Sequence, residues 1–410
     1  MASRYRANRR RTADLFATIA PDAYGASPIP LRHPFVFYDG HLPAFSFITL
    51  VRDALHRPSL DAELEQLFNR GIDPRDVALA AQHKRAVWPE RAVVEHMGAA
   101  WDAAVLEAYA HATLEDAHNP NLVRGQAAFT ILEHEEMHHE TLTYIINRLD
   151  RAHQRGPRGT HVDEQAPTRL PIAIPAGTAT LGARREAIPF GWDNEFDETV
   201  VHVDAFGIDA YDVTNGDYLA FVREGGPVPS FWFERDGAWW LRAVFEDIPL
   251  PLSWPVYATH DQAAAFAAWS GARLPTEAEF HRAAYGTPSG AERPHPWGDE
   301  APDPGRHGNF GWRRYDPEPV GRSPQGASAW GVEDLIGNGW EWTSTPFAPL
   351  PGFAPMASYP PYSTDFFDGA HLVMKGASPV TASALVRRSL RNWFYHDYPY
   401  MFATFRRAYD

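Results

Sequence analysis

The chain has 410 residues, of which 44% are hydrophobic and 22% are charged, and its formal net charge is -15 at pH 7. This length allows two domains with cores of their own, and the negative charge argues against a broad nucleic-acid-binding surface. The sequence contains no cysteine, which excludes disulfides, thiolate metal ligands and cysteine nucleophiles.

The first residues, MASRYRANRRRT, are basic. No apolar stretch follows them, as a secretory signal would require, and no run of about 18 or more apolar residues occurs that would span a membrane. We therefore expect a cytoplasmic protein that binds neither nucleic acid nor membrane. The oligomeric state stays open.

Residues 1–152 predict a helical domain. Helical patterns cover residues 3–19, 31–55, 87–112 and 122–150, and a shorter one covers residues 61–68. In the third long helix an i,i+4 stripe predicts the core-facing residues Val93, Met97, Trp101, Val105 and Tyr109. Four long helices predict a four-helix bundle, an architecture that places metal ligands in its core.

The helix at residues 122–150 carries two histidines on its apolar stripe. The stripe consists of Ala127, Ile131, His134, His138, Leu142, Ile145 and Leu149. Two imidazoles at i,i+4 can chelate one transition metal. Ordinary buried histidines are the alternative, but two on one stripe, among four glutamates, favour a metal.

A metal needs at least one further ligand. The upstream candidates are His33, His41, His83, His96, His111 and His118. We prefer His41, because Gly40 precedes it and Pro43 follows, where a proline bends the helix and removes a backbone donor. Three imidazoles without a thiolate suit Zn(II), Fe(II) or Cu, and the ligand types alone do not separate these ions.

Residues 134–138, HEEMH, also match the H-E-x-x-H signature of zinc metalloproteases, in which the glutamate is the general base. The downstream third ligand of many such enzymes has no obvious counterpart here. The domain that follows suggests a substrate-binding partner rather than a protease lobe. The protease is therefore the weaker interpretation.

Residues 153–169 predict a linker, because they are polar, rich in Pro and Gly, and without periodicity. Residues 170–410 predict an α+β domain with few regular elements. Short strands are expected at 173–182 and 200–213, and two short helices at 215–223 and 260–269. Long stretches rich in Trp, Pro and Gly fill the rest, and such loops are a natural place for a binding surface.

The second half resembles the formylglycine-generating-enzyme fold, a modified C-type-lectin-like domain. The matching blocks, in order, are FGWDNEFDETVVHVDAFGIDAYDVTNGDYLAFV, WSGARLPTEAEFHRAAYG, DLIGNGWEWTSTPF, KGAS and RNWFYHDYPYMFATFR. Residues 134–140 fit the H-x-x-x-H-x-E pattern of the DinB-like family, so the bundle resembles that family. Together the two domains resemble the ergothioneine-synthase sulfoxide synthases, which are iron enzymes.

This resemblance implies Fe(II) ligands at His41, His134 and His138. It also implies that Asn392 and Trp393 line the pocket for a trimethylated α-amino group, and cation–π attraction agrees with an aromatic wall there. Phe394 stands where some relatives carry an acidic residue.

Further roles follow from the same resemblance. Met137 stands directly before His138, where many relatives have Gln. The segment HEEMHHET resembles the branch of the family that takes free cysteine as sulfur donor. Lys84 and Arg85 are candidates to bind the carboxylate of the sulfur donor, with plain surface charges as the alternative. Tyr359 and Tyr362 match the region that supplies a tyrosine near the oxygen site, with packed aromatic residues as the alternative.

The function implied is an oxidoreductase that joins a thiol, cysteine or γ-glutamylcysteine, to the imidazole C2 of hercynine with O2, in ergothioneine biosynthesis. Calcium is expected as a structural ion in the C-terminal domain, with Asn194 and Glu195 among the residues considered. The lack of cysteine excludes the copper-dependent formylglycine activity.

Four alternatives remain. One is a selenoneine-type synthase that takes a selenosugar. Another is an ovothiol-type histidine sulfoxide synthase, although such relatives usually carry a further methyltransferase domain after the point where this sequence ends, FRRAYD. The others are a DinB-like zinc thiol transferase or hydrolase and a non-catalytic binding protein.

Overall fold

The computed structural model describes residues 1–69, 87–168 and 170–410. The chain forms two compact units. The first comprises Met1–Pro157 together with the short segment Met356–Pro360, and the second comprises Arg158–Pro355 and Pro361–Asp410. The boundary after Pro157 lies inside the predicted linker, and the expected combination of a helical part with a mixed α and β part is confirmed.

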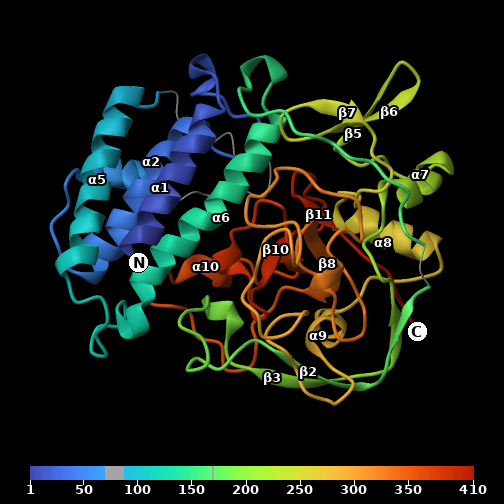
Figure 1. Ribbon diagram of the computed structural model, residues 1–410. Coiled ribbons are helices and arrows are strands. Elements are labelled where there is room, and N and C mark those ends of the chain that lie inside the picture. The colour runs from blue at the N-terminus through green and yellow to red at the C-terminus, as the bar shows by residue number, and fades with distance from the viewer. Residues whose placement is uncertain (70–86, 169) are drawn as a thin grey trace. The chain divides into compact units, whose positions relative to one another are not determined.

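Four long helices build the described part of the first unit (Figure 1). They are α1 (Ala2–Ala17), α2 (Phe35–Ser46), α5 (Arg91–His111) and α6 (Gln126–Arg148). Contacts join α1 to α6, α6 to α2, α2 to α5 and α5 to α1, which closes a four-helix bundle. Pro43 lies inside α2, and the chain continues from Phe47 to Ala54 as a π-helix, a form often found at functional sites. The short helix α3 (Ala62–Phe68) follows.

The basic N-terminal segment is part of this bundle. Arg4 binds Glu136 of α6 through two hydrogen bonds, of 2.8 and 2.5 Å. Arg9 donates to Glu135 at 2.8 Å and to Asp102 of α5 at 3.0 Å. The side chain of Glu135 is fully buried, so its charge needs such a partner. The arginines of α1 therefore compensate the acidic residues that flank the two histidines of α6.

The predicted core stripe of α5 is wrong at its first residue. Val93 is 44% exposed, whereas Val94 is buried. Residues spaced by four drift about 40° per step around a helix of 3.6 residues per turn, so a strict i+4 series leaves the core after two steps. The buried face instead runs through Val94, Trp101, Val105 and Ala108.

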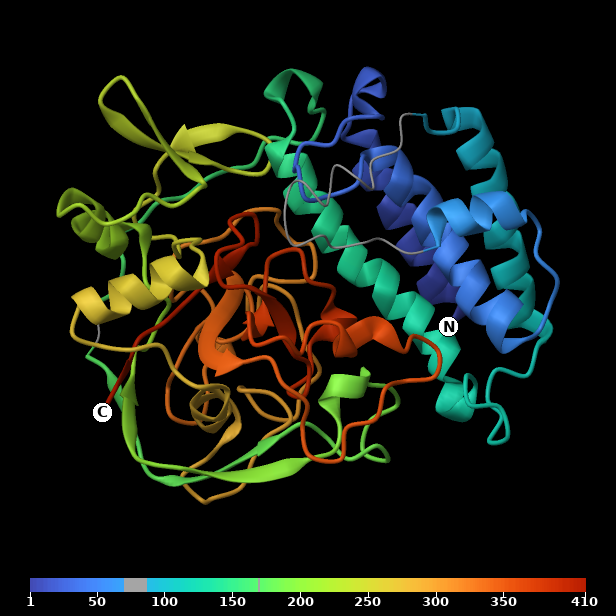
Figure 2. The ribbon, with the colours of Figure 1, turned by 180° about the vertical axis from the view of Figure 1, so that it is seen from behind.

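The described residues of the second unit form four small sheets. The largest has the strand order β10-β9-β8-β11, formed by Asn392–Tyr395, His371–Ala377, Gly339–Pro346 and Ala403–Thr404. A second sheet joins β1 (Ile172–Ile174), β4 (Phe206–Ile208) and β12 (Ala408–Tyr409). A third pairs β2 (Gly177–Leu181) with β3 (Thr199–Val203). The fourth consists of β5 (Trp232–Arg235), β6 (Ala238–Arg242) and β7 (Asp247–Pro249). In both views β8 and β9 lie in the interior of this unit, surrounded by loops (Figures 1 and 2).

The two helices predicted in the second half are confirmed as α7 (Asn215–Arg223) and α8 (His260–Trp269). A third, α9 (Glu277–Tyr285), begins within the RLPTEAEF block, where the sequence had predicted none. Thr276 caps its first turn and Glu279 completes a reciprocal capping box, a signal that was present in the sequence as T-E-A-E. Helix α9 packs against β2, β3, β8 and β9.

Among the described residues, no helix combines the length and the apolar character needed to cross a lipid bilayer.

Candidate metal centre and substrate site

Three histidines of the first unit meet in its core. His41 comes from α2, and His134 and His138 come from α6. One ring nitrogen of each lies within 4.8 Å of the others, and no other such group of His, Cys, Asp or Glu occurs among the described residues. The ring centroids are 5.1 Å apart from His41 to either partner and 4.4 Å apart within α6. The structure thus brings together the three predicted ligands.

A backbone carbonyl orients His41. The Nδ1 of this ring donates a hydrogen bond to the carbonyl oxygen of Phe68 at 2.7 Å. This contact places the proton on Nδ1 and leaves the lone pair of Nε2 for a metal. Gly40 permits the arrangement, because a Cβ at this position would lie 2.5 Å from the Phe68 ring.

All three imidazoles are neutral at pH 7. Burial lowers the pKa of His41 to about 4, against the opposing effect of the Phe68 carbonyl. Burial lowers the pKa of His134 and of His138 well below 6.5, and the neighbouring imidazoles add to it. A neutral imidazole offers the lone pair that metal binding requires.

The donor set fits a divalent transition metal. It consists of three nitrogen donors, and imidazole suits iron, zinc and copper. Within the described part of the chain, the Nδ1 atoms of His134 and His138 are buried without a hydrogen-bond partner. Buried polar atoms without partners are rare in folded proteins, and each needs an explanation. A ligand bound among these rings would provide one.

Aromatic side chains surround the three rings. Phe37 stacks on His41 at 4.9 Å and 18°, and Phe45 stacks on His134 at 3.6 Å and 11°. Tyr38 lies 5.7 Å from the ring of His138. These contacts hold the imidazole planes and keep the surroundings apolar, which explains the low pKa values.

The two predicted tyrosines lie in different units. Tyr359 belongs to the segment Met356–Pro360 of the first unit, where its ring centroid is 6.2 Å from that of His134. Tyr362 belongs to the second unit, stacked on Trp192 at 3.8 Å. Only Tyr359 thus lies beside a predicted metal ligand among the described contacts.

The predicted ammonium-binding residues lie on β10. Trp393 and Asn392 are both half-buried. The indole of Trp393 stacks on Phe347 at 4.1 Å and 6°, and the rings of Tyr362 and Phe366 lie 5.2 and 5.7 Å from it. These rings pack against the indole of Trp393 itself, so binding of a quaternary ammonium group there stays a prediction.

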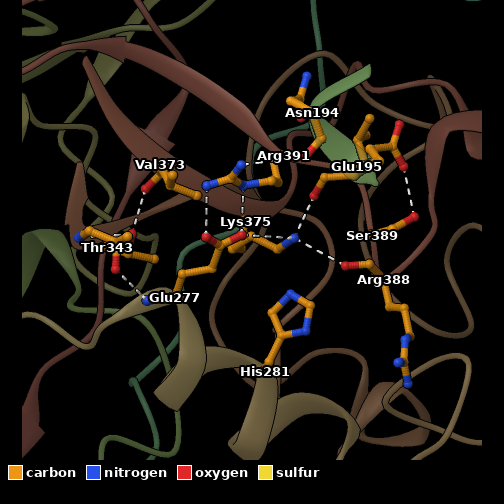
Figure 3. A network of polar contacts seen from close by, with 12 residues as sticks. Asn194, Glu195, Glu277, His281, Thr343, Val373, Lys375, Arg388, Ser389 and Arg391 are labelled. Atoms are coloured by element: carbon orange, nitrogen blue, oxygen red, sulfur yellow. Dashed lines mark hydrogen bonds and ion pairs between the residues drawn. The ribbon is translucent and has the colours of Figure 1, made fainter. Parts of the chain in front are cut away.

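A buried ion pair supports β10 (Figure 3). Arg391, directly before Asn392, donates to both carboxylate oxygens of Glu277 of α9 at 3.0 and 3.1 Å. Its guanidinium lies 5.1 Å from the centroid of Phe347, the ring on which Trp393 stacks. No sequence pattern signals this pair, although Glu277 lies in the RLPTEAEF block and Arg391 opens the RNWF block.

Lys375 of β9 is the third charged residue of this buried cluster. Its ammonium donates to the carbonyl oxygens of Arg388 and Leu390 at 3.0 and 2.5 Å and lies 3.8 Å from Glu277. Burial lowers the pKa of Lys375 to about 8, against the attraction of Glu277. Glu277, Lys375 and Arg391, which are among the side chains drawn in Figure 3, therefore join α9, β9 and the residue before β10 by charge.

Asn194 and Glu195, considered for calcium, lie in the 3-10 turn η5 (Asp193–Glu195). The carboxylate of Glu195 accepts hydrogen bonds from Arg387 at 2.8 and 2.5 Å and from Ser389 at 2.7 Å. Burial opposes its ionisation, but Arg387 keeps the pKa of Glu195 below its ordinary value. These contacts occupy Glu195 with an internal ion pair, so calcium stays a prediction without a cluster to support it.

The remaining predicted site residues are less informative. Met137 is half-buried on α6, directly before His138. Lys84 and Arg85 lie outside the described residues.

Comparison with known proteins identifies the family to which this chain belongs. Residues 158–410 match the family described as "Sulfatase-modifying factor enzyme 1-like domain". The chain is 34% identical to a hercynine oxygenase of Mycolicibacterium thermoresistibile, over 93% of this chain and 88% of that protein. It is 32% identical to a hercynine oxygenase of Mycolicibacterium smegmatis, over 93% of this chain and 92% of that protein. It is also 28% identical to ergothioneine biosynthesis protein 1 of Neurospora crassa, over 91% of this chain and 53% of that longer protein. With a similarity that spans nearly the whole chain and a matching C-terminal domain, this protein belongs to the hercynine oxygenase family of ergothioneine-synthase-type proteins.

Proposed function

We propose that this protein is an Fe(II)- and O2-dependent sulfoxide synthase that joins a thiol to the imidazole C2 of hercynine in ergothioneine biosynthesis. The observation that carries the proposal is the buried group of three neutral imidazoles, His41, His134 and His138, in a chain of the hercynine oxygenase family. We also infer that the helical unit is DinB-like and that the protein acts in the cytoplasm on small molecules.

The three histidines would hold the iron, which supplies the redox chemistry that lets O2 react with the two substrates. The overall reaction balances without a further reductant. Hercynine loses the C2 hydrogen, the thiol loses its S–H hydrogen, and one oxygen atom ends on sulfur while the other leaves as water. Two electrons come from forming the C–S bond and two from oxidising the sulfur.

The residues of β10 would bind hercynine. Trp393 provides an aromatic face for the trimethylammonium group, and a cation–π contact at a partly desolvated site contributes up to about 2 kcal/mol. Asn392 would add a polar contact. With Phe394 in place of an acidic residue, the ammonium relies on aromatic rings rather than on a counter-charge.

Tyr359 is the better candidate of the two tyrosines for proton transfer. Its ring lies beside His134 and its phenol can hold or release a proton at Oη. Tyr362, which stacks on Trp192 and meets the ring of Trp393 edge-on, would instead shape the ammonium pocket.

The donor is proposed to be cysteine, with γ-glutamylcysteine as the second choice. Met137 leaves an apolar side chain where many relatives offer an amide, which suits a smaller donor with fewer polar groups. Lys84 and Arg85 stay predictions as carboxylate-binding residues.

Oxygen consumption tests the proposal. Protein loaded anaerobically with Fe(II) is given hercynine and cysteine singly and then together, and products are identified by mass. We expect uptake with both substrates and a product equal in mass to their sum plus one oxygen less two hydrogens. Uptake with cysteine alone would indicate a thiol dioxygenase. No uptake with cysteine, γ-glutamylcysteine or a selenosugar would overturn the iron assignment.

A further inference from the structure

Phe45 occupies a special position beside the three histidines. It lies on α2 four residues after His41, and so on the same face of the helix. Its side chain is buried, with 4% exposure. The ring stacks on His134 at 3.6 Å and 11° and meets the ring of Tyr359 edge-on at 5.2 Å and 72°. One side chain therefore contacts both a predicted metal ligand and the predicted proton donor.

The main chain before Tyr359 is held on α6. The backbone N–H of Ser358 donates to the side-chain oxygen of Gln126 at 3.2 Å, and its hydroxyl lies 3.0 Å from that of Thr130. These contacts fix the backbone of the segment Met356–Pro360. They do not fix the side-chain torsions of Tyr359, which depend on what its ring packs against.

Phe45 is suited to fix those torsions. A T-shaped pair sets both the distance and the angle between two rings and is worth about 0.5–1.5 kcal/mol beyond the burial of area. Because Phe45 also stacks flat on His134, movement of its own ring is limited as well. The placement of Tyr359 relative to His134 is thereby coupled to α2.

We propose that Phe45 is a positioning residue that holds the ring of Tyr359 beside His134 and so determines how the enzyme divides between C–S coupling and oxidation of the thiol alone. This inference rests on the proposed function. Coupling converts hercynine, thiol and O2 into sulfoxide and water, so protons must reach the departing oxygen atom. The competing reaction adds both oxygen atoms to the thiol and yields a sulfinic acid without forming water. If the phenol of Tyr359 is displaced, the rate of coupling should therefore fall, while the rate of the competing oxidation of the thiol should not.

The test compares Phe45→Leu with Phe37→Leu. Phe37 is the matched control, because it is a buried phenylalanine of the same helix that stacks on the predicted ligand His41. Its other ring contacts among the described residues are with His33, Tyr38, Phe68 and Trp88, and not with Tyr359. We expect Phe45→Leu to lower the ratio of sulfoxide to sulfinic acid by roughly 10-fold or more, since small misplacements in a site cost up to 100-fold. Phe37→Leu also removes a stack on a predicted ligand, so its overall activity should fall, but it should leave that ratio near the wild-type value.

Two further readouts do not depend on turnover. Hydrogen–deuterium exchange should be faster in the segment Met356–Pro360 of Phe45→Leu than of Phe37→Leu, and bound iron should remain similar in both. Phe45→Met serves if Phe45→Leu does not fold. Tyr359→Phe should lower the same product ratio, and adding Phe45→Leu to it should change the ratio little more, because both changes act on one group.

Two results would overturn the inference: an unchanged product ratio in Phe45→Leu, or additive effects in the double variant. If the wild-type protein forms no coupled product with any donor, the proposed function fails, and the exchange experiment still reports whether Phe45 holds the segment.

Discussion

The two units each bury a polar cluster, and the clusters differ in kind. In the second unit the buried charges are matched: Arg391 with Glu277 at 3.0 Å, and Arg406 with Glu341 at 2.5 Å. In the first unit His41 and its two partners from α6 are all neutral and face one another among aromatic rings.

This difference separates a scaffold from a binding site. A matched ion pair satisfies its own hydrogen bonds and acts on the fold, and breaking it is costly because one charge stays buried alone. The three imidazoles carry no charge to match, and among the described residues the Nδ1 atoms of His134 and His138 have no hydrogen-bond partner, so the nitrogen lone pairs of the cluster are available to a ligand. Substitutions in the first cluster should therefore affect ligand binding, and substitutions in the second should affect stability.

The largest expected effect is that of His134→Ala. Removing one of three ligands should weaken iron binding by more than the roughly 10–100-fold that losing an outer hydrogen-bond partner costs, and coupling should fall to background. His96→Ala, at an exposed position of α5, is the control and should bind iron like wild type. Iron content after dialysis measures the effect, and full iron retention in His134→Ala would refute the triad.

The next effect is on stability. Arg391→Met should lower the free energy of unfolding by about 3–5 kcal/mol, because Glu277 is left buried without its main partner. Arg273→Met is the control, since Arg273 pairs with Glu279 of the same helix α9 but is 37% exposed; its loss should cost about 1 kcal/mol or less. Denaturant unfolding compares the two, and equal losses would contradict the scaffold role of the buried pair.

The pH dependence of the metal-free protein comes third. The pKa of His41 is about 4 when folded and near 6.5 when unfolded, so between these values the unfolded chain binds more protons. Stability is therefore present above about pH 6.5 and is lost as the pH falls toward 4, by roughly 3 kcal/mol for this residue. His41→Phe should reduce the slope of unfolding free energy against pH, and parallel curves would count against a buried neutral ring.

Gly40→Ala should have the smallest effect. Its new Cβ would meet the Phe68 ring at 2.5 Å, and such overpacking costs about 1–3 kcal/mol. It should also weaken iron binding, because Phe68 provides the carbonyl that orients His41. Gly98→Ala of α5 is the control. Among the described residues its Cβ would meet Pro43 alone, at an ordinary 3.5 Å, and the change should stabilise the helix slightly. A similar outcome for both variants would rule out the Phe68 contact as the cause.

The spacing of residues along the sequence predicted much of the first unit and two helices of the second. The stripe on α6 is almost wholly buried, from Ala127 to Leu149, and only His138 keeps partial exposure. The short helices α7 and α8 were predicted at the right residues. Such features depend on the spacing of residues within one segment, which the sequence displays directly.

Other features could not be predicted with the same certainty. Tyr359 and Tyr362 are three residues apart and chemically equal, yet the boundary between the units falls between them, after Pro360. The carbonyl of Phe68 carries no sequence signal at all, because every residue has one.

The sequence by itself thus determined the two histidines of α6, the absence of thiolate chemistry and the order of the family's blocks. Only the tertiary structure decided how His41, Phe45 and Tyr359 come together with them. The physical reason is that helical periodicity places residues on one face of one helix, whereas contacts between segments far apart in the chain depend on how all of the elements pack.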